Sequence, residues 1–277
     1  PFWHRHGAWE EGRGWLERVL ALPGASDPAS LARRAKALLA AGWLAHYQND
    51  FTTAVALLEE SLACHRRLGR TGPLADVLIC RGLLARFAGE YPAAIDRYEE
   101  ALALAKEQFR GADNMTDRLG ALRALVNSDF AEDRTQALEA FYKRFSDDPQ
   151  VVELWFSVQA SSDRAGQLPQ IRQLLDHPAF DWKNPNKVRS VVGAFAAQNL
   201  AAFHNPDGSG YEFLAEQVCR LDDSNPQIAA RLVAPLTRWR KFAPGYSKQM
   251  KSALERIRDK AELSRDVYEV VHKSLAD

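Results

Sequence analysis

Apolar residues recur at helical spacing along most of this chain. Residues 184–211 show the pattern clearly, because one face carries only apolar side chains, at Val188, Val191, Val192 and Phe195. Three to four apolar positions in every two turns are typical of a helix that buries one face. Arg189 lies off that face and is expected to point elsewhere. Residues 205–210, Asn-Pro-Asp-Gly-Ser-Gly, predict a tight turn and the start of another helix.

The same helical spacing extends to both sides of this segment, and no stretch shows the strict alternation of a half-buried strand. Proline or a capping residue precedes several of the apolar runs, as expected at helix starts. We therefore predict an all-α protein. Beyond the repeated region described next, helices are expected at 116–126, 137–145, 149–158, 168–175, 211–221, 228–236, 247–258 and 264–275.

The first third of the chain contains an internal repeat with an offset of 40 residues. The matched positions are Gly42 with Gly82, Ala45 with Ala85, Ala54 with Ala94, Leu58 with Tyr98, and Leu62 with Leu102. Small residues recur where two helices would approach closely, and large apolar residues recur where they would fill the space between them. A fixed period of this size indicates stacked helix pairs. A third, partial copy at 7–20 has Gly12 where alanine stands later, and contains only the second helix of a pair.

These repeated positions resemble the tetratricopeptide repeat, over residues 1–107. The period is longer than the usual ~34 residues of that repeat, and the excess lies at 68–74. The resemblance implies a concave surface that binds a protein or peptide partner, although such helices can also serve only to extend the stack. A stack that begins in mid-repeat is expected to leave an apolar face uncovered.

Residues 108–277 form the second predicted domain, and residues 108–276 resemble the C-terminal helical domain of bacterial aminopeptidase N, a zinc-dependent alanyl aminopeptidase. The resemblance rests on Asp113-Asn114-Met115-Thr116, Trp155-Phe156, His177-Pro178-Ala179-Phe180, Asn184-Pro185-Asn186, Gly193-Ala194-Phe195, Phe203-His204, Asp207-Gly208-Ser209-Gly210-Tyr211, Asn225-Pro226-Gln227, Leu254-Glu255 and Asp266-Val267-Tyr268-Glu269. It does not include the repeats. The fold it implies is an α-superhelical domain that continues the helical-repeat solenoid.

In that family the domain is a superhelical bowl over the active-site cavity of the catalytic domain. The resemblance implies that Arg189, Gln227 and Arg231 turn toward this cavity and the bound peptide. The spacing agrees, because Gln227 and Arg231 are four residues apart on one predicted helix face. Arginine suits such a role, since its planar guanidinium can bind a carboxylate with two hydrogen bonds. The alternative is that the three residues are ordinary solvated surface residues.

The zinc motif of such peptidases is absent from this sequence. They require His-Glu-x-x-His on a helix, and none of the seven histidines is followed by glutamate. His4 and His6 are the only close pair of histidines, and they are not expected to form a metal site. We expect no catalytic residue and no cofactor in this chain, with zinc only in a catalytic domain that it does not contain.

Composition limits the partners. The net charge is zero and neither half is strongly basic, which disfavours a nucleic-acid binder. No apolar run reaches the ~18 residues of a membrane span. The three cysteines, Cys64, Cys80 and Cys219, stand singly and are expected to be small buried residues of a reduced, cytoplasmic protein.

Two hypotheses about function follow. The first is a non-catalytic interaction scaffold with a protein or peptide partner. The second is a piece of a zinc aminopeptidase that is active only when a catalytic domain is supplied. The chain begins at Pro1 rather than methionine, and two kinds of helical region follow one another. We therefore expect a fragment or a fusion, natural or artificial.

Overall fold

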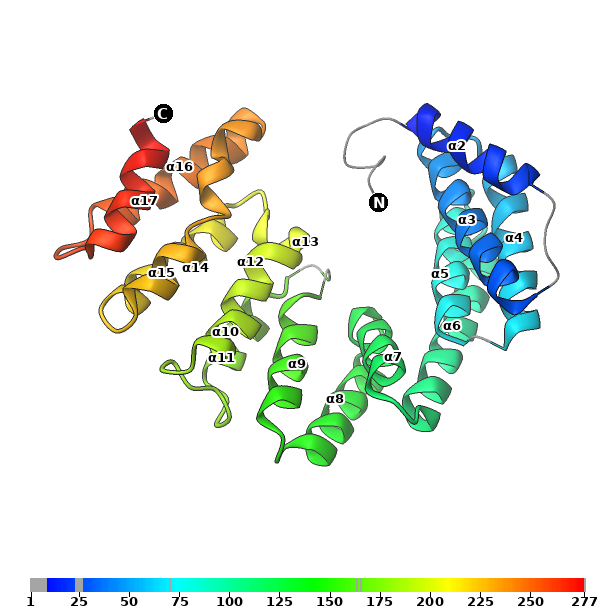
Figure 1. Ribbon diagram of the computed structural model, residues 1–277, viewed down its shortest axis with the longest axis horizontal. Helices are drawn as coiled ribbons and strands as arrows, with labels where there is room; N and C mark the ends of the chain where they lie inside the picture. Colours follow the sequence, from blue (N-terminus) through cyan, green and yellow to red (C-terminus); the bar gives the residue numbers. More distant parts are fainter. Residues whose placement is uncertain (1–8, 23–26, 70, 163, 165, 277) are drawn as a thin grey trace. The chain divides into compact units, whose positions relative to one another are not determined.

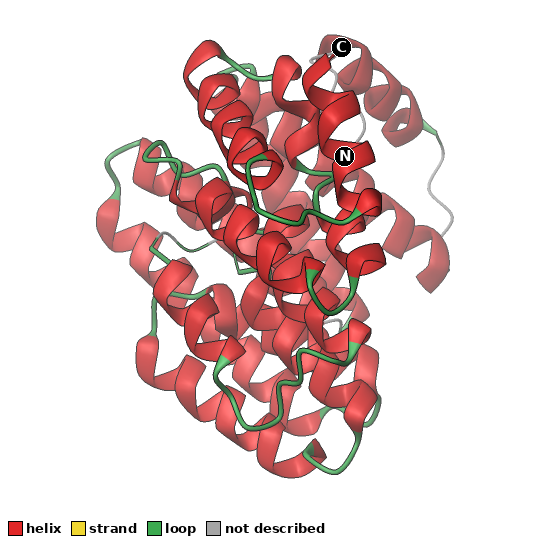
Figure 2. Cartoon of the chain, turned by 90° about the vertical axis from the view of Figure 1, so that its left-hand side faces the viewer, coloured by secondary structure: helices red, strands yellow, loops and turns green. Residues whose placement is uncertain are grey.

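The computed structural model describes residues 9–22, 27–69, 71–162, 164 and 166–276, with no side chains described at 71–73. All regular secondary structure in these ranges is helical, as Figure 2 shows. The prediction of an all-α, solenoid-like fold is confirmed. The chain divides into two compact units, residues 1–125 and residues 126–277.

The first unit consists of paired antiparallel helices (Figure 1). In each full repeat, the first helix packs along the second. The two pairs then stack on each other, because the second helix of the first pair packs against the first helix of the second pair. The helices are α2 (Trp9–Ala21), α3 (Pro28–Tyr47), α4 (Phe51–Leu68), α5 (Thr71–Phe87), α6 (Tyr91–Gly111) and α7 (Met115–Asn127).

The turns inside the two helix pairs repeat the same backbone geometry. Asn49 and Gly89, 40 residues apart, both adopt a positive φ, of 61° and 79°. In each turn the next residue donates its N–H to the carbonyl of the matched alanine, from Asp50 to Ala45 at 2.9 Å and from Glu90 to Ala85 at 2.8 Å. The 40-residue offset found in the sequence is therefore a structural repeat.

Close approach of the paired helices depends on glycine at the matched positions. A Cβ atom at Gly42 would lie 2.9 Å from the side chain of Leu58 on α4. At Gly82 it would lie 2.5 Å from the ring of Tyr98 on α6. Real side chains essentially never approach this closely, so the predicted pairing of small and large residues across each helix pair is confirmed.

The helix α7 joins the end of the repeats through Arg118. The Arg118 guanidinium donates to the carbonyls of Phe109 and Ala112, and the Gln108 amide donates to the carbonyl of Asp117 at 2.9 Å. These hydrogen bonds attach α7 to the first compact unit. The domain boundary predicted at residues 107–108 was placed by sequence resemblance and not by compactness, so it stays a prediction.

The second unit is a succession of shorter helices (Figure 1). Its core contains a cluster of aromatic rings from three of these helices, with centroids 5.2 to 5.9 Å apart, formed by Phe195, Phe203, Tyr211 and Phe213. The elements are α8 (Ala131–Phe145), α9 (Pro149–Ala160), α10 (Leu168–Leu175), α11 (Pro185–Val188), the π-helix η1 (Arg189–Gly193), α12 (Ala194–Gln198), α13 (Leu200–Phe203), α14 (Ser209–Asp222), α15 (Pro226–Leu232), the 3₁₀-helix η2 (Leu236–Lys241), α16 (Pro244–Arg258) and α17 (Arg265–Ala276).

Candidate functional site

The first predicted site residue, Arg189, lies in a continuous helical run from α11 through η1 to α12. Asn184 begins the run, because its side-chain oxygen accepts from the N–H groups of Asn186 at 2.9 Å and Lys187 at 3.3 Å. The apolar face predicted from the sequence is confirmed, since each of its residues is at most 1% exposed: Val188, Val191, Val192 and Phe195.

Arg189 begins the π-helical turn of this run and its side chain is exposed. Its guanidinium makes a long contact of 3.5 Å with the side-chain oxygen of Asn186, one turn earlier. A π-turn inserts an extra residue into the helix and shifts the direction of the side chains that follow. The hydrophobic spacing did not predict this turn.

The other two predicted residues, Gln227 and Arg231, lie on α15. Asn225 caps this helix by accepting from the N–H of Ile228 at 3.2 Å. Gln227 and Arg231 are both exposed. The opposite face of the helix is buried, at Ile228, Ala229 and Leu232. The predicted placement of both polar side chains on one face is confirmed.

The two elements that carry these residues meet at one contact, between Gly193 and Leu232. A Cβ atom placed on Gly193 would lie 3.6 Å from Cβ of Arg189 and 3.8 Å from Cδ2 of Leu232. The π-turn of Arg189 therefore packs next to α15, where Leu232 directly follows Arg231. The predicted residues thus belong to neighbouring elements of one unit, although their role toward a peptide stays a prediction.

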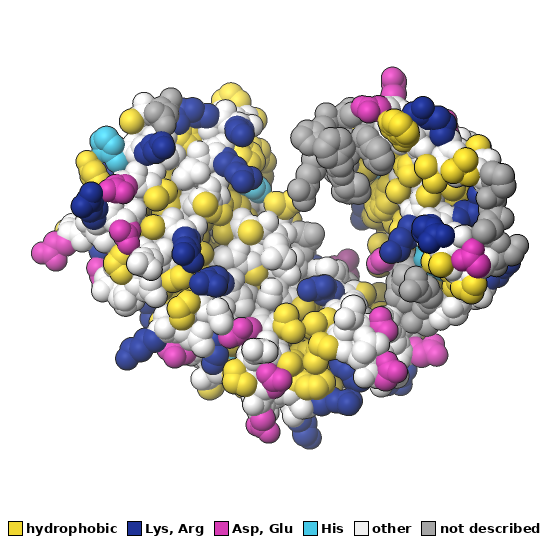
Figure 3. All heavy atoms as spheres, in the orientation of Figure 1, with side chains coloured by type: hydrophobic (Ala, Val, Ile, Leu, Met, Phe, Trp, Pro, Cys, Tyr) yellow, Lys and Arg dark blue, Asp and Glu magenta, His cyan; other side chains and the backbone are white. Residues whose placement is uncertain are grey.

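The arginines of this region are available for a ligand. Within the part of the chain that the structure describes, no salt bridge joins Arg189 or Arg231 to an acidic side chain. Figure 3 shows lysine and arginine side chains in dark blue gathering over α14 to α17. A guanidinium free of internal acidic partners can bind a carboxylate or a carbonyl oxygen.

The turn at residues 205–210 is held by hydrogen bonds within the turn and by Gln249, whose side-chain amide donates to the carbonyl of Pro206 at 2.8 Å. The Asp207 carboxylate accepts from the N–H of Ser209 at 2.8 Å. Hydrogen bonding to the side chain of Ser209, and then to its backbone, holds the pKa of Asp207 below its usual value. Gly208 has a φ of 76°, which favours glycine. A carboxylate already lies at the start of α14, so the expected tight turn, and not an anion site, is what the structure shows.

A buried pair that the sequence did not predict lies behind this turn. The Tyr211 hydroxyl lies 2.6 Å from Nδ1 of His204, and Tyr211 is 0% exposed. Burial raises the pKa of Tyr211 to about 12 and lowers the pKa of His204. The His204 ring also stacks on Phe242 at 4.9 Å. The pair connects the turn to the core and is structural.

The residues that the structure describes do not fit a zinc site. No group of three or more histidine, cysteine, aspartate or glutamate side chains is placed to hold a metal ion among the described residues. His177 lies instead in an aromatic cluster, where it accepts the N–H of Ala179 at Nδ1, and burial lowers its pKa. His4 and His6 lie outside the described residues.

The cysteines follow the prediction in part. Cys64 and Cys80 are buried, and burial raises the pKa of Cys80 to about 12, so it remains a neutral thiol. Cys219 is only half-buried. None of the described helices is long and apolar enough to cross a membrane.

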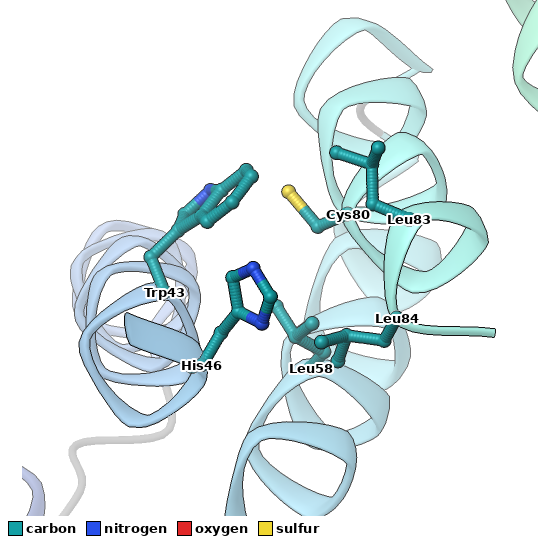
Figure 4. A pocket seen from close by; sticks show the side chains of 7 residues that line it. Trp43, His46, Leu58, Cys80, Leu83 and Leu84 are labelled. Atoms are coloured by element: carbon teal, nitrogen blue, oxygen red, sulfur yellow. The ribbon is translucent and has the colours of Figure 1, made fainter. Parts of the chain in front are cut away.

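The first unit contains a small hollow between α3, α4 and α5 (Figure 4). It includes about 180 Å³ of empty space, part of which is open solvent, and has no room for a water molecule. Its walls are almost entirely apolar, with His46 and Cys80 as the polar exceptions. We interpret it as a packing gap beside Gly42 and not as a ligand site.

Comparison with known proteins places these elements in a family. The family described as "Domain of unknown function (DUF3458_C) ARM repeats" matches residues 10–276. The chain belongs to this family. The match spans both units, and ARM repeats are stacked helix pairs with a period of roughly 40 to 47 residues. The 40-residue offset of the first unit fits that range, and the tetratricopeptide assignment stays a prediction.

The curated relatives are aminopeptidases. The chain is 42% identical over 172 residues to aminopeptidase N of Haemophilus influenzae, covering 62% of this chain and 20% of that protein. It is 41% identical over 173 residues to aminopeptidase N of Escherichia coli, with the same coverage. The resemblance to the C-terminal helical domain of aminopeptidase N is confirmed. The chain spans about a fifth of the length of these relatives.

A solved structure extends the likeness beyond that region. Aminopeptidase A of Legionella pneumophila, solved in complex with aspartic acid, matches with a TM-score of 0.65 and 27% identity. The match covers 94% of this chain and 30% of the other. A single aminopeptidase chain therefore contains helices like those of most of both units.

Proposed function

We propose that this chain is a non-catalytic helical scaffold that carries the active-site-covering domain of an aminopeptidase N. The observation that supports this most directly is the 42% identity to aminopeptidase N over 172 residues. The sequence contains no His-Glu-x-x-His motif. In this proposal the chain lines one side of a peptide-binding cavity, and a separate zinc-bearing domain catalyses the hydrolysis.

Three side chains on this side of the cavity are proposed to bind the peptide. Arg189 and Arg231 present guanidinium groups that bind carbonyl or carboxylate oxygens of a peptide. Gln227 adds an amide one turn before Arg231, which can donate and accept. All three are exposed, on elements that pack together at Gly193. In the proposal these hydrogen bonds orient the peptide, and its peptide bond is cleaved in the separate catalytic domain.

The alternative hypothesis, an aminopeptidase that releases N-terminal residues once it is completed, uses the same surface. It differs in requiring that the chain bind a catalytic domain productively. The match of one family across residues 10–276 supports a single helical domain over an artificial fusion. A cytoplasmic location remains part of the proposal.

Binding tests this proposal. The full chain is titrated with the part of Escherichia coli aminopeptidase N that lies outside the matched region, in the presence of a peptide substrate. We expect a complex, and we expect Arg231→Ala to weaken peptide binding about tenfold, the loss of one charged hydrogen bond.

Arg258→Ala is the matched control, because Arg258 is an exposed arginine already paired with its neighbour Asp259 at 2.7 Å. The proposal fails if no complex forms, or if the two arginine variants bind the peptide equally well.

We also propose that the first unit binds a protein or peptide partner. This part rests on the apolar side chains that the unit leaves exposed, such as Phe87 at 61% and Tyr91 at 63%. Monomeric proteins rarely expose large contiguous apolar patches without a binding role.

A further inference from the structure

The loop at residues 176–184, between α10 and α11, is held at Ala179 from two sides. The N–H of Ala179 donates to Nδ1 of His177 at 3.1 Å. The carbonyl oxygen of Ala179 accepts from the ammonium group of Lys187, which lies two residues before Arg189. A single backbone unit thus joins the start of the loop to the helical run that carries Arg189.

The end of the same loop begins that helical run. Asn184 is the last residue of the loop, and its side-chain oxygen accepts from the N–H of Asn186 at 2.9 Å. The side-chain oxygen of Asn186 in turn lies 3.5 Å from the Arg189 guanidinium. The placement of Arg189 therefore depends on the loop, both through the cap at Asn184 and through the bond from Lys187.

His177 accepts its hydrogen bond only while its ring is neutral. A backbone N–H can only donate, so Nδ1 of His177 carries no proton in this structure. In the imidazolium ion both ring nitrogens carry protons and neither can accept. Protonation of His177 therefore breaks the bond to Ala179 and leaves two donors facing each other.

The surroundings of His177 make protonation disruptive. Its ring centroid lies 5.1 Å from that of Tyr142 on α8, and 5.1 and 5.6 Å from those of Trp155 and Phe156 on α9. Burial lowers the pKa of His177, and the charge of Lys187 on α11 lowers it further. Of these neighbours, Lys187 is charged and Tyr142 is titratable. The aromatic rings attract a cation, but they do not replace the lost hydrogen bond.

We propose that His177 is a pH-operated latch on the loop at residues 176–184. The neutral ring keeps the loop closed through Ala179, and so keeps α11 and Arg189 in place. The protonated ring releases Ala179, and its repulsion from the Lys187 ammonium opens the loop. Because burial lowers the pKa of His177, the release occurs below the pH of about 6.5 at which an exposed imidazole titrates.

The latch goes beyond the proposed binding of a peptide by Arg189 and does not require it. Its contacts all lie within the second unit, and it is observed on the loop itself with no peptide present. A chain that fails to bind peptide therefore leaves the latch standing. A loop that does not respond to pH overturns the latch and leaves the peptide proposal standing.

Amide hydrogen exchange of the full chain tests the latch. Exchange is followed residue by residue by NMR at pH 7.0 and pH 4.5, and each rate is divided by the intrinsic rate at that pH. We expect the protection of the Ala179 amide to fall about tenfold at pH 4.5, as expected for the loss of one hydrogen bond. Val191, which is completely buried in η1, is the internal reference and should keep its protection.

Two substitutions of His177 separate the latch from a general effect of acid. His177→Asn cannot titrate but keeps an acceptor, because an asparagine side chain accepts from the N–H two residues later, so protection of Ala179 should be equal at both pH values. His177→Phe keeps a ring without an acceptor, so protection should be about tenfold lower at both. His272→Asn, at an exposed histidine of α17, is the matched control and should keep the pH response.

Three outcomes would overturn the inference. The first is equal protection of Ala179 at both pH values in the unmodified chain, and the second is an undiminished pH response in His177→Asn. The third requires no substitution. The loss of protection must have the same midpoint as the chemical shift of the His177 Cε1 proton, and a different midpoint assigns the response to another group.

Discussion

The Tyr211 hydroxyl and Nδ1 of His204 lie 2.6 Å apart, at the point where the turn at residues 205–210 meets the core of the second unit. Tyr211 is completely buried, on α14, and His204 directly follows α13. The hydrogen bond thus ties together two helices that the turn connects. It also satisfies two polar atoms that would otherwise be unpaired in an apolar region.

Tyr211→Phe should lower the free energy of unfolding by about 1 to 2 kcal/mol, because it leaves a partly buried histidine nitrogen without its partner. Urea unfolding measures the change. Tyr268→Phe is the control, since Tyr268 is 46% exposed, and its effect should stay within about 0.5 kcal/mol. Equal effects of the two substitutions would contradict a role for the His204 bond.

The stability of the chain should depend on pH in two windows. Burial lowers the pKa values of His46, His177 and His204, so the folded state keeps these rings neutral. Their contribution is present above the unfolded pKa of about 6.5 and is lost as the pH falls below it. Unfolding in urea at pH 7.5 and pH 5.5 should show lower stability at the acidic value.

The second window is alkaline. Burial raises the pKa of Tyr211 to about 12, whereas an unfolded tyrosine ionises near pH 10. The stabilising contribution is present below pH ~10 and is lost as the pH rises toward 12. Tyr211→Phe should reduce the slope of stability against pH in this range, and an unchanged slope would contradict the assignment.

Gly82→Ala should destabilise the first unit by about 1 to 3 kcal/mol, the usual effect of adding a methyl group to a packed contact. The added Cβ would lie 2.5 Å from the Tyr98 ring. Gly14→Ala on α2 is the matched control, because no atom lies within 4 Å of its Cβ position. Alanine there should be neutral or stabilising by about 0.5 to 1 kcal/mol, since it favours the helix. Thermal unfolding of both variants makes the comparison.

Two neighbouring aspartates should differ in importance although both contact Lys260. The Asp222 side chain is 1% exposed, and it accepts from the Lys260 ammonium at 3.3 Å and from the N–H of Ser264 at 3.0 Å. The Asp223 side chain is 71% exposed and accepts from the same ammonium at 2.6 Å. The shorter of the two contacts is the more solvated one.

Asp222→Ala should therefore lower the free energy of unfolding by about 3 kcal/mol, because it leaves the partly buried N–H of Ser264 and the Lys260 charge without their partner. Asp223→Ala should cost less than about 1 kcal/mol. Chemical unfolding of the two variants decides, and a larger effect for Asp223 would contradict this account.

The sequence predicted the repeat and the helical class because both depend on local spacing. The offset of 40 residues located the turns at Asn49 and Gly89, and the apolar face through Phe195 is buried as predicted. The resemblance to a known family led to Arg189, Gln227 and Arg231, which are exposed in the structure. These features can be predicted from residues close together in the sequence, or from the pattern of a known family.

What the sequence could not predict depends on contacts between distant residues. On α9, Leu154 is 36% exposed, while Val152 and Phe156 are buried. Helical periodicity alone does not say which side a short helix turns to its neighbours. The π-turn after Arg189 also has no periodic signal, because it shifts the register inside one continuous helix.

Under our proposal, this chain lines a peptide-binding cavity and has no catalytic chemistry of its own. The direct measurement is hydrolysis of an alanyl arylamide by the purified chain with added zinc, with and without the catalytic part of an aminopeptidase N. We predict no hydrolysis by the chain alone. We predict hydrolysis when the catalytic part is present, at a rate or substrate affinity that the chain increases and Arg231→Ala reduces. Zinc-dependent hydrolysis by the chain alone, abolished by a chelator, would contradict the proposal.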